Sequence, residues 1–275
     1  MPWCTLDNGR RLWYEDQGQG QPLVLVHGWC MSSAVWRFQL ESLGDRFRVI
    51  APDLRGHGQS EAAGEGHDFP GFAADLQALF FHLDLHGALL AGWSLGAQVA
   101  LLAYERLRER LSGLVLVSGT PRFTSSEDFA PGLDATELAG MVVRVRRNLA
   151  RAREGFMADM FAPGERDDHE LDQRIGQVLA AILLPEKSVA VQGLAALAEA
   201  DMRGVLPAID LPTLIINGDQ DRICLPGASA YMARWIQPST HVVLDGCGHA
   251  PFLTRSTDFN DSITGFSRRI FAQGR

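Results

Sequence analysis

Residues 88–96 read Ala88-Leu89-Leu90-Ala91-Gly92-Trp93-Ser94-Leu95-Gly96, a short apolar run that ends in the pattern Gly-x-Ser-x-Gly. The run predicts a buried strand, and the residues from Leu95 onward predict a helix. A serine between such a strand and such a helix is typical of a nucleophile elbow, a strained turn that presents the hydroxyl at the end of a sheet. The glycines two positions before and after the serine, Gly92 and Gly96, leave room for the strand and helix backbones to pass each other. We therefore expect Ser94 to be a nucleophile.

Similar apolar runs recur along the chain, at residues 23–26, 48–51, 114–117, 213–216 and 241–244. Helices are expected at residues 34–43, 72–85, 95–108, 226–235 and 257–269. Runs that are buried on both faces and alternate with helices indicate a mainly parallel, twisted sheet with helices on each side. The predicted fold class is therefore α/β.

The segment between residues 121 and 206 contains no strand-like run. Its pattern is helical and is interrupted by Pro131, Pro163 and Pro185. The segment falls late in the sheet, and the flanking motifs place the candidate chemistry at the same end. We expect a core domain of residues 1–120 and 207–275, with residues 121–206 inserted as a helical lid. The alternative is that these helices only add stability.

The composition argues against several classes of protein. The 275 residues are 46% hydrophobic and 21% charged, with a formal net charge of -8. An acidic balance argues against broad affinity for nucleic acid or anionic membranes. No run of about 18 apolar residues predicts a membrane span, and no leader-like stretch opens the chain. The four cysteines lack the paired spacing of a zinc site. We expect a cytoplasmic monomer with reduced thiols and no metal.

Serine needs a base, and the base needs an acid to orient it. In a nucleophile-elbow fold the chain order is serine, acid, histidine. His249 follows the last predicted strand in Cys247-Gly248-His249-Ala250-Pro251-Phe252, and is preferred over His241 and His169. For the acid, Asp221 lies three residues after Gly218 and is preferred. Asp219 would rather cap the turn, and Asp245 is a third candidate.

Acyl transfer also needs donors aimed at the developing oxyanion. The N–H of Leu95, directly after the serine, is one candidate, and the N–H of Trp29, after an early strand, is the other. His27 is interpreted as a structural residue of the same loop. The segment Asp53–Ser60 is rich in turn formers and is interpreted as a loop packed behind the oxyanion loop.

Together, these motifs resemble those of the α/β-hydrolase superfamily over the whole chain outside residues 121–206. The resemblance is narrower for His27-Gly28-Trp29, Val35-Trp36, Gly92–Gly96, Ser118–Phe123 and His249–Phe252. These segments are most similar to the family of pimeloyl-acyl-carrier-protein methyl ester esterases of biotin synthesis. That resemblance implies substrate contacts at Trp29, Ser94, Leu95 and His249. It also implies them in the lid, at Phe156, Met157, Ala158, Asp159 and Met160.

The partner that this resemblance implies is a strongly acidic carrier protein docked on basic lid residues. Five arginines fall in one predicted helix: Arg144, Arg146, Arg147, Arg151 and Arg153. Such a cluster suits carboxylates or phosphate. Arg151 matches a docking position of the family, whereas Gly155 stands where the family has another arginine. The alternative is a solvated helix face, since Glu154, Asp159, Glu165, Asp167 and Asp168 follow.

The resemblance implies hydrolysis of the methyl ester of a pimeloyl group carried by that protein, through an acyl-enzyme and with no cofactor. The alternatives are a general short-chain carboxylesterase without a carrier partner, another reaction of this fold such as lactone or carbon–carbon bond hydrolysis, and a non-catalytic ligand-binding receptor. A haloalkane dehalogenase is disfavoured because that chemistry needs a carboxylate at position 94.

Overall fold

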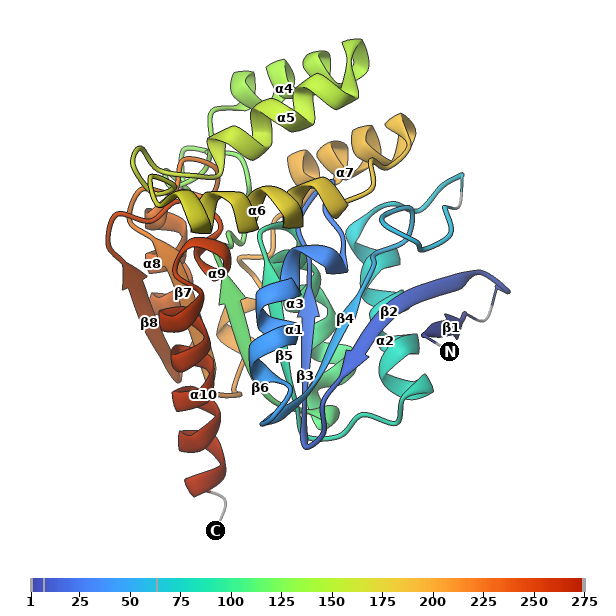
Figure 1. The fold of residues 1–275 in the computed structure, drawn as a ribbon, viewed down its shortest axis with the longest axis vertical. Coiled ribbons are helices and arrows are strands. Elements are labelled where there is room, and N and C mark those ends of the chain that lie inside the picture. The colour runs from blue at the N-terminus through green and yellow to red at the C-terminus, as the bar shows by residue number, and fades with distance from the viewer. Residues whose placement is uncertain (1, 7, 63, 274–275) are drawn as a thin grey trace.

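A computed structural model describes residues 2–6, 8–62 and 64–273, which form one sheet with helices on both faces (Figure 1). The strands are β1 (Trp3–Thr5), β2 (Arg11–Gln17), β3 (Gln21–Val26), β4 (Phe47–Pro52), β5 (Ala88–Trp93), β6 (Leu111–Val117), β7 (Thr213–Gly218) and β8 (Ser239–Leu244). Their order in the sheet is β1-β2-β4-β3-β5-β6-β7-β8. β2 is antiparallel to β1 and β4, and the remaining pairs are parallel.

The six predicted strands are all present, and the predicted α/β class with a mainly parallel sheet is confirmed. β5 is buried along its whole length, as expected for a central parallel strand covered on both faces. β8 corrects the expectation of burial on both faces, because it lies at the edge of the sheet and Val243 is 45% exposed. β1 and β2 were not predicted. In β2, buried Leu12 and Tyr14 alternate with more exposed residues, the pattern of a strand with one solvated face.

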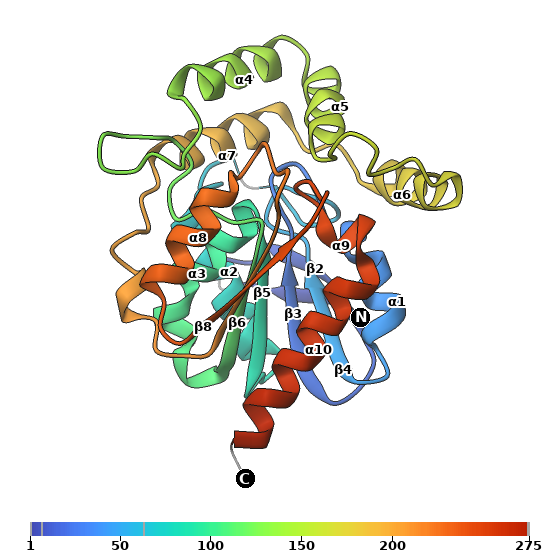
Figure 2. The ribbon, with the colours of Figure 1, turned by 90° about the vertical axis from the view of Figure 1, so that its left-hand side faces the viewer.

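Ten helices are present in the described ranges, and those outside residues 121–206 pack on the two faces of the sheet. The ten helices are α1 (Arg37–Leu43), α2 (Phe69–His82), α3 (Leu95–Leu107), α4 (Ala135–Arg147), α5 (Leu149–Asp159), α6 (His169–Ala181), α7 (Lys187–Glu199), α8 (Pro226–Trp235), α9 (Pro251–Thr254) and α10 (Ser256–Gln273), with short 3-10 turns at Ser33–Trp36, Arg108–Arg110 and Leu206–Ala208. Figure 2 shows α2, α3 and α8 on one face and α1 and α10 on the other. Asp68 caps α2 by accepting a 2.8 Å hydrogen bond from the N–H of Gly71.

The four helices α4 to α7 follow β6 and precede β7, and they lie across the carboxyl ends of the strands (Figures 1 and 2). We call residues 121–206 the helical insertion. The prediction of one helix carrying all five arginines is wrong, because Asn148 separates α4 from α5. Asn148 has extended backbone angles, and its Oδ1 accepts a 3.1 Å hydrogen bond from the N–H of Arg151. An amide side chain in that position is a standard helix N-cap.

Among the helices of the described ranges, none combines the length and apolar character needed to span a membrane.

Candidate active site

Ser94 occupies the turn between β5 and α3. Its backbone has φ 56° and ψ -118°, a conformation that non-glycine residues adopt only where the surrounding structure enforces it. A side chain at Gly92 would clash with the carbonyl of Gly96, and one at Gly96 would clash with the carbonyl of Val26. The two glycines are therefore required for α3 to leave the sheet at this angle, as the sequence pattern predicts.

Asp221 and His249 reach the same end of the sheet from the loops after β7 and β8. His249 Nδ1 lies 2.8 Å from Asp221 Oδ2. The other carboxylate oxygen of Asp221 accepts hydrogen bonds from the N–H groups of Ile223 at 2.8 Å and Cys224 at 3.0 Å. Both members of the pair are buried, with His249 at 0% and Asp221 at 3% exposure. The carboxylate is therefore fixed on the Nδ1 side of the ring.

The alternative candidates for acid and base either form other contacts or are exposed, as Asp245 is. Asp219 Oδ1 accepts a 3.2 Å hydrogen bond from the N–H of Cys247, so it closes a turn. His241 Nε2 lies 2.7 Å from Asn217 Oδ1, and His169 is exposed at the start of α6. Among the described residues, Asp221 is the carboxylate that contacts His249.

His249 Nε2 is buried and forms no hydrogen bond with any described residue. Ser94 belongs to the same cluster, because its side chain hydrogen-bonds that of Cys224, whose N–H binds the Asp221 carboxylate. Burial raises the pKa of the neighbouring Cys224 thiol well above its usual value, Asp221 raises it further, and a hydrogen bond with Ser94 opposes both effects. In enzymes without substrate, the bond between nucleophile and base is often long and tightens in the complex.

The loop after β3 passes beside the serine, because a Cβ built on Gly28 would lie 3.3 Å from Ser94 Cβ. Trp29 follows in a turn in which the N–H of Met31 bonds the Gly28 carbonyl at 3.3 Å. Leu95 is the first residue of α3, so its N–H has no acceptor within the helix and stands at the positive end of the helix dipole. Both predicted oxyanion donors thus belong to segments that flank Ser94.

His27 is a structural residue, as predicted. Its Nδ1 lies 2.8 Å from the carbonyl of Gly28, and its Nε2 accepts a 2.9 Å hydrogen bond from the N–H of Leu54. Asp53 binds the same region, accepting from Ser33 N at 2.6 Å and Gln59 N at 2.8 Å. The Asp53–Ser60 segment is therefore a loop packed against the turn after β3. Burial lowers the pKa of His27 to about 4 and that of His57 to about 3.

The helical insertion covers the serine and the histidine. Trp29 donates from Nε1 to the carbonyl of Ala190 in α7 at 2.9 Å, and its ring meets Phe156 edge to face with centroids 5.2 Å apart. The Phe156 ring is also 6.4 Å from that of His249, and the N–H of His249 donates to the Met160 carbonyl at 2.7 Å. Ser94 is consequently only 6% exposed.

The predicted contact segment Phe156–Met160 divides between two environments. Phe156 and Met160 meet the histidine loop, Met157 is half-buried, and Ala158 and Asp159 are exposed. Phe156 and Asp159 also line a cavity of about 270 Å³. The other lining residues are Phe123, Leu133, Glu137, Leu138, Met141, Arg144, Ala152, Arg222 and Ile223. Its lining combines apolar side chains, such as Leu138 and Met141, with charged ones, such as Glu137 and Arg222.

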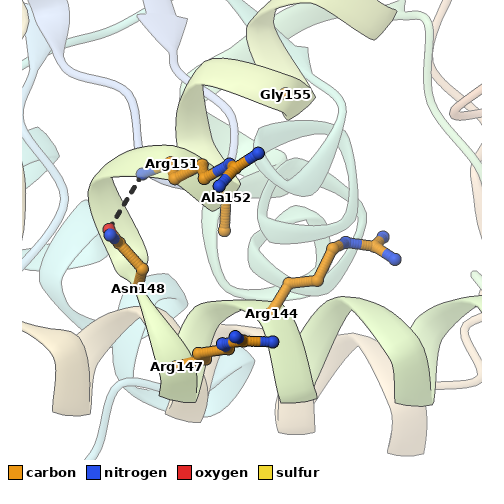
Figure 3. Close-up of a pocket in the computed structure, with 6 residues that line it drawn as sticks. All are labelled: Arg144, Arg147, Asn148, Arg151, Ala152 and Gly155. Atoms are coloured by element: carbon orange, nitrogen blue, oxygen red, sulfur yellow. Dashed lines mark hydrogen bonds between the residues drawn. The ribbon is translucent and has the colours of Figure 1, made fainter.

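A second hollow, of about 730 Å³, lies between α4 and α5 and is lined by Arg144, Arg147, Asn148, Arg151, Ala152 and Gly155 (Figure 3). We call it the arginine groove. Arg144 and Arg147 come from α4 and Arg151 from α5. Two of the five arginines that were expected to cluster lie outside the arginine groove. Arg146 is exposed but does not line the groove, and Arg153 donates to the carbonyl of Ile182 at 2.9 Å.

Glu165 differs from the acidic residues around it, since Asp159, Asp167 and Asp168 are exposed. Its side chain is buried at 8% exposure. It accepts hydrogen bonds from Ala162 N, Gly248 N, Cys247 Sγ and Thr254 Oγ1. No signal in the sequence separates this acid from its exposed neighbours. Within the described ranges, no group of three or more His, Cys, Asp or Glu side chains is placed to hold a metal ion.

Comparisons with known proteins agree with this architecture. A family model described as "alpha/beta hydrolase fold" matches residues 21–256. A pimeloyl-[acyl-carrier protein] methyl ester esterase of Nitrosospira multiformis is 32% identical over 262 residues, covering 94% of this chain and 98% of that protein. A non-heme haloperoxidase of Rhodococcus erythropolis is 31% identical over 271 residues, covering 97% and 99%. The structure of an esterase from Exiguobacterium antarcticum superposes with a TM-score of 0.89 at 26% identity, covering 97% and 98%.

Proposed function

Because the chain belongs to the alpha/beta hydrolase fold family, we propose that it is a serine carboxylesterase with Ser94 as nucleophile, His249 as base and Asp221 as the acid that orients the base. The observation that carries this proposal is the buried Asp221–His249 pair, 2.8 Å apart, beside a serine held in the strained elbow. An acid on Nδ1 leaves Nε2 as the free nitrogen, which is the nitrogen that must accept the serine proton.

The proposed reaction has two steps. His249 Nε2 takes the proton of Ser94 Oγ, and Oγ attacks the ester carbonyl while the N–H groups of Leu95 and Trp29 bind the oxyanion. The tetrahedral intermediate collapses to an acyl-serine, and the leaving alkoxide takes the proton from His249. A water molecule then gives a proton to His249 Nε2 and attacks the acyl carbonyl. The bond to Ser94 Oγ breaks, Oγ takes that proton back from His249, and the acid is released. Asp221 stabilises the imidazolium in both steps.

The substrate that we propose is the methyl ester of a pimeloyl group on an acyl-carrier protein, with Phe156–Met160 bordering the acyl chain. The name of the Nitrosospira multiformis relative supports this choice. The cavity of about 270 Å³, here called the acyl cavity, adds support, because Leu138, Met141 and Phe156 contribute apolar side chains to its lining. A pimeloyl chain is an apolar spacer that such a cavity can hold.

We further propose that the acidic carrier docks on the arginine groove. Arg144, Arg147 and Arg151 concentrate positive charge there on a chain whose net charge is -8. Guanidinium groups bind carboxylates and phosphates through paired hydrogen bonds, and a local basic surface steers an acidic partner into register. Arg146, on the same helix but outside the groove, would add only to the surrounding positive field.

The experiment is hydrolysis of the pimeloyl-carrier methyl ester, measured beside a short soluble ester. Wild type should cleave both, and Ser94→Ala should cleave neither. The triple variant Arg144→Ala, Arg147→Ala, Arg151→Ala should lose activity on the carrier-linked ester only. A matched triple of exposed arginines on other helices, Arg106→Ala, Arg234→Ala, Arg268→Ala, controls for the change in net charge.

Cleavage of short esters with no activity on the carrier-linked ester would replace the carrier proposal with a general short-chain carboxylesterase. Equal losses in the two triple variants would remove the arginine groove as the docking site. Because one relative is named a non-heme haloperoxidase, halide oxidation by hydrogen peroxide belongs in the same assay series. Ser94→Ala activity equal to wild type on every ester would refute the proposed nucleophile.

A further inference from the structure

Glu165 stands in the turn between α5 and α6, where its own N–H bonds the carbonyl of Ala162 at 3.1 Å. Its carboxylate leaves the helical insertion and enters the loop that carries His249. Oε2 accepts from Gly248 N at 2.9 Å and from Ala162 N at 2.6 Å. Oε1 accepts from Cys247 Sγ at 3.0 Å and from Thr254 Oγ1. One carboxylate thus joins the insertion to both sides of His249.

The four donors around Glu165 are uncharged groups in a buried setting. Cys247 is 0% exposed and Thr254 is 6% exposed. An ionised carboxylate is stable in such surroundings only when its oxygens are hydrogen-bonded, and removing it would leave several buried donors without partners. If the Glu165 side chain pointed into solvent, none of these four donors would have it as an acceptor. The arrangement therefore ties the position of the histidine loop to this side chain.

The backbone of His249 is held at the same junction. Its N–H donates to the Met160 carbonyl at 2.7 Å. A side chain at Gly248 would clash with that carbonyl and would come within 3.0 Å of Glu165 Oε2. The two segments are thus in contact backbone to backbone, without room for an intervening side chain or water. A shift of either segment would move the His249 ring relative to Ser94.

We propose that Glu165 is a positioning residue that fixes the His249 loop against the helical insertion and so sets the distance between His249 Nε2 and Ser94 Oγ. This role rests on the proposed function, since it concerns the base of the ester hydrolysis. Asp221 sets which nitrogen faces the serine, whereas Glu165 sets where the loop stands. Misplacing a catalytic group by about 1 Å can cost on the order of a hundredfold in rate.

The test compares Glu165→Ala with the conservative Glu165→Gln on a short soluble ester. Glutamine keeps one carbonyl oxygen for the N–H groups of Ala162 and Gly248, and its amide can donate to Thr254, whose hydroxyl can reorient. We expect Glu165→Ala to lower kcat by about ten- to a hundredfold with KM little changed. Glu165→Gln should retain most of the wild-type kcat. The exposed acid of the same turn, substituted as Asp167→Ala, is the control.

A second readout does not depend on turnover. The low-field proton resonance of the His249 Nδ1–H bonded to Asp221 should be present in wild type and Glu165→Gln, and shifted or broadened in Glu165→Ala. If Glu165→Ala does not fold, Thr254→Val removes one donor at nearly constant volume and should give a smaller change of the same kind. This resonance tests the position of His249 even if wild type hydrolyses no ester, so the two proposals can fail separately.

Three results would overturn the proposal. In the first, folded Glu165→Ala keeps the wild-type kcat and the wild-type resonance. In the second, it loses thermal stability alone, which would make Glu165 a packing residue. In the third, Glu165→Gln is impaired as severely as Glu165→Ala, which would mean that the hydrogen bonds retained by glutamine do not position the loop.

Discussion

The indole Nε1 of Trp93 donates a 2.8 Å hydrogen bond to the backbone carbonyl of His249. The residue before the nucleophile therefore holds the loop of the base from within the core. Trp93 is itself fully buried, and its ring packs edge to face on Phe252 with centroids 4.9 Å apart. The histidine loop is thus fixed both from the core and from the insertion.

Replacing Trp93 by phenylalanine removes this hydrogen bond and keeps most of the aromatic packing. We expect Trp93→Phe to lower the free energy of unfolding by about 1–3 kcal/mol, because the His249 carbonyl is left without a partner. The value of kcat on a short ester should fall by about tenfold as the loop loosens. Urea unfolding and initial rates measure the two effects. Trp235→Phe, at a tryptophan that is 44% exposed on α8, is the matched control and should change neither.

Replacing Asp221 by asparagine tests the orientation of the base. The amide presents a donor where the carboxylate accepted, which favours the wrong tautomer of His249 and withdraws the charge that stabilises its imidazolium form. Loss of the acid in a serine triad typically lowers kcat by about 10⁴-fold. Asp219→Asn alters an aspartate of the same loop that bonds Cys247 N, and its effect should be far smaller. Equal losses in the two variants would contradict the assignment of Asp221.

The positions of Ser94 and His249 at one end of the sheet could be predicted from the order of motifs along the chain. The elbow at Ser94 and the loop of His249 follow apolar strands, so their position at one end of the sheet could be inferred from parallel topology. The break at Asn148 was missed, because helical periodicity continues across it and a capping amide differs little from a surface one. Glu165 was missed because its burial depends on where a distant loop folds. A local charge pattern carries no such information.

The buried histidines predict that stability falls in mild acid. Burial lowers the pKa of His27 to about 4 and of His57 to about 3, both below the usual 6.5. Between about pH 4 and 6.5 the unfolded chain therefore binds more protons than the folded one. This contribution to stability is complete above pH 6.5 and is lost as the pH falls. For each extra proton that the unfolded chain binds, the free energy of unfolding falls by about 1.4 kcal/mol per pH unit of acidification.

Urea unfolding at pH 7, 6 and 5 measures this slope, and His57→Gln should reduce it by about one proton. The exposed histidine at the start of α6, replaced in His169→Gln, is the control. A slope that is the same in His57→Gln and wild type would show that His57 does not titrate on unfolding in this range.

Because Arg55 and Asp75 form a buried ion pair, we expect stability to depend strongly on the Asp75 carboxylate. The two side chains are 9% and 6% exposed and form two hydrogen bonds, from Nε at 2.6 Å and from Nη2 at 2.5 Å. Asp75→Asn leaves a buried guanidinium without its counter-charge, which should cost about 3–5 kcal/mol of unfolding free energy. Asp84, 81% exposed beside Arg110, is the matched control. A loss in Asp75→Asn no larger than in Asp84→Asn would contradict this account.

Phe156 is where the helical insertion meets both the base and the acyl cavity, since its ring lies 6.4 Å from that of His249 and also lines the cavity. Removing the ring enlarges the space available to an acyl chain, and each further buried methylene is worth about 0.8 kcal/mol. We therefore expect Phe156→Ala to shift the ratio of kcat/KM for esters two carbons apart in favour of the longer chain by roughly tenfold. The measurement is kcat/KM for a series of soluble esters of increasing acyl length. Phe81→Ala, at an exposed phenylalanine of α2 outside the cavity, is the control.

An unchanged ratio in a Phe156→Ala enzyme that still turns over would mean that the acyl chain does not pass Phe156. The path of the chain would then have to lie along another part of the insertion.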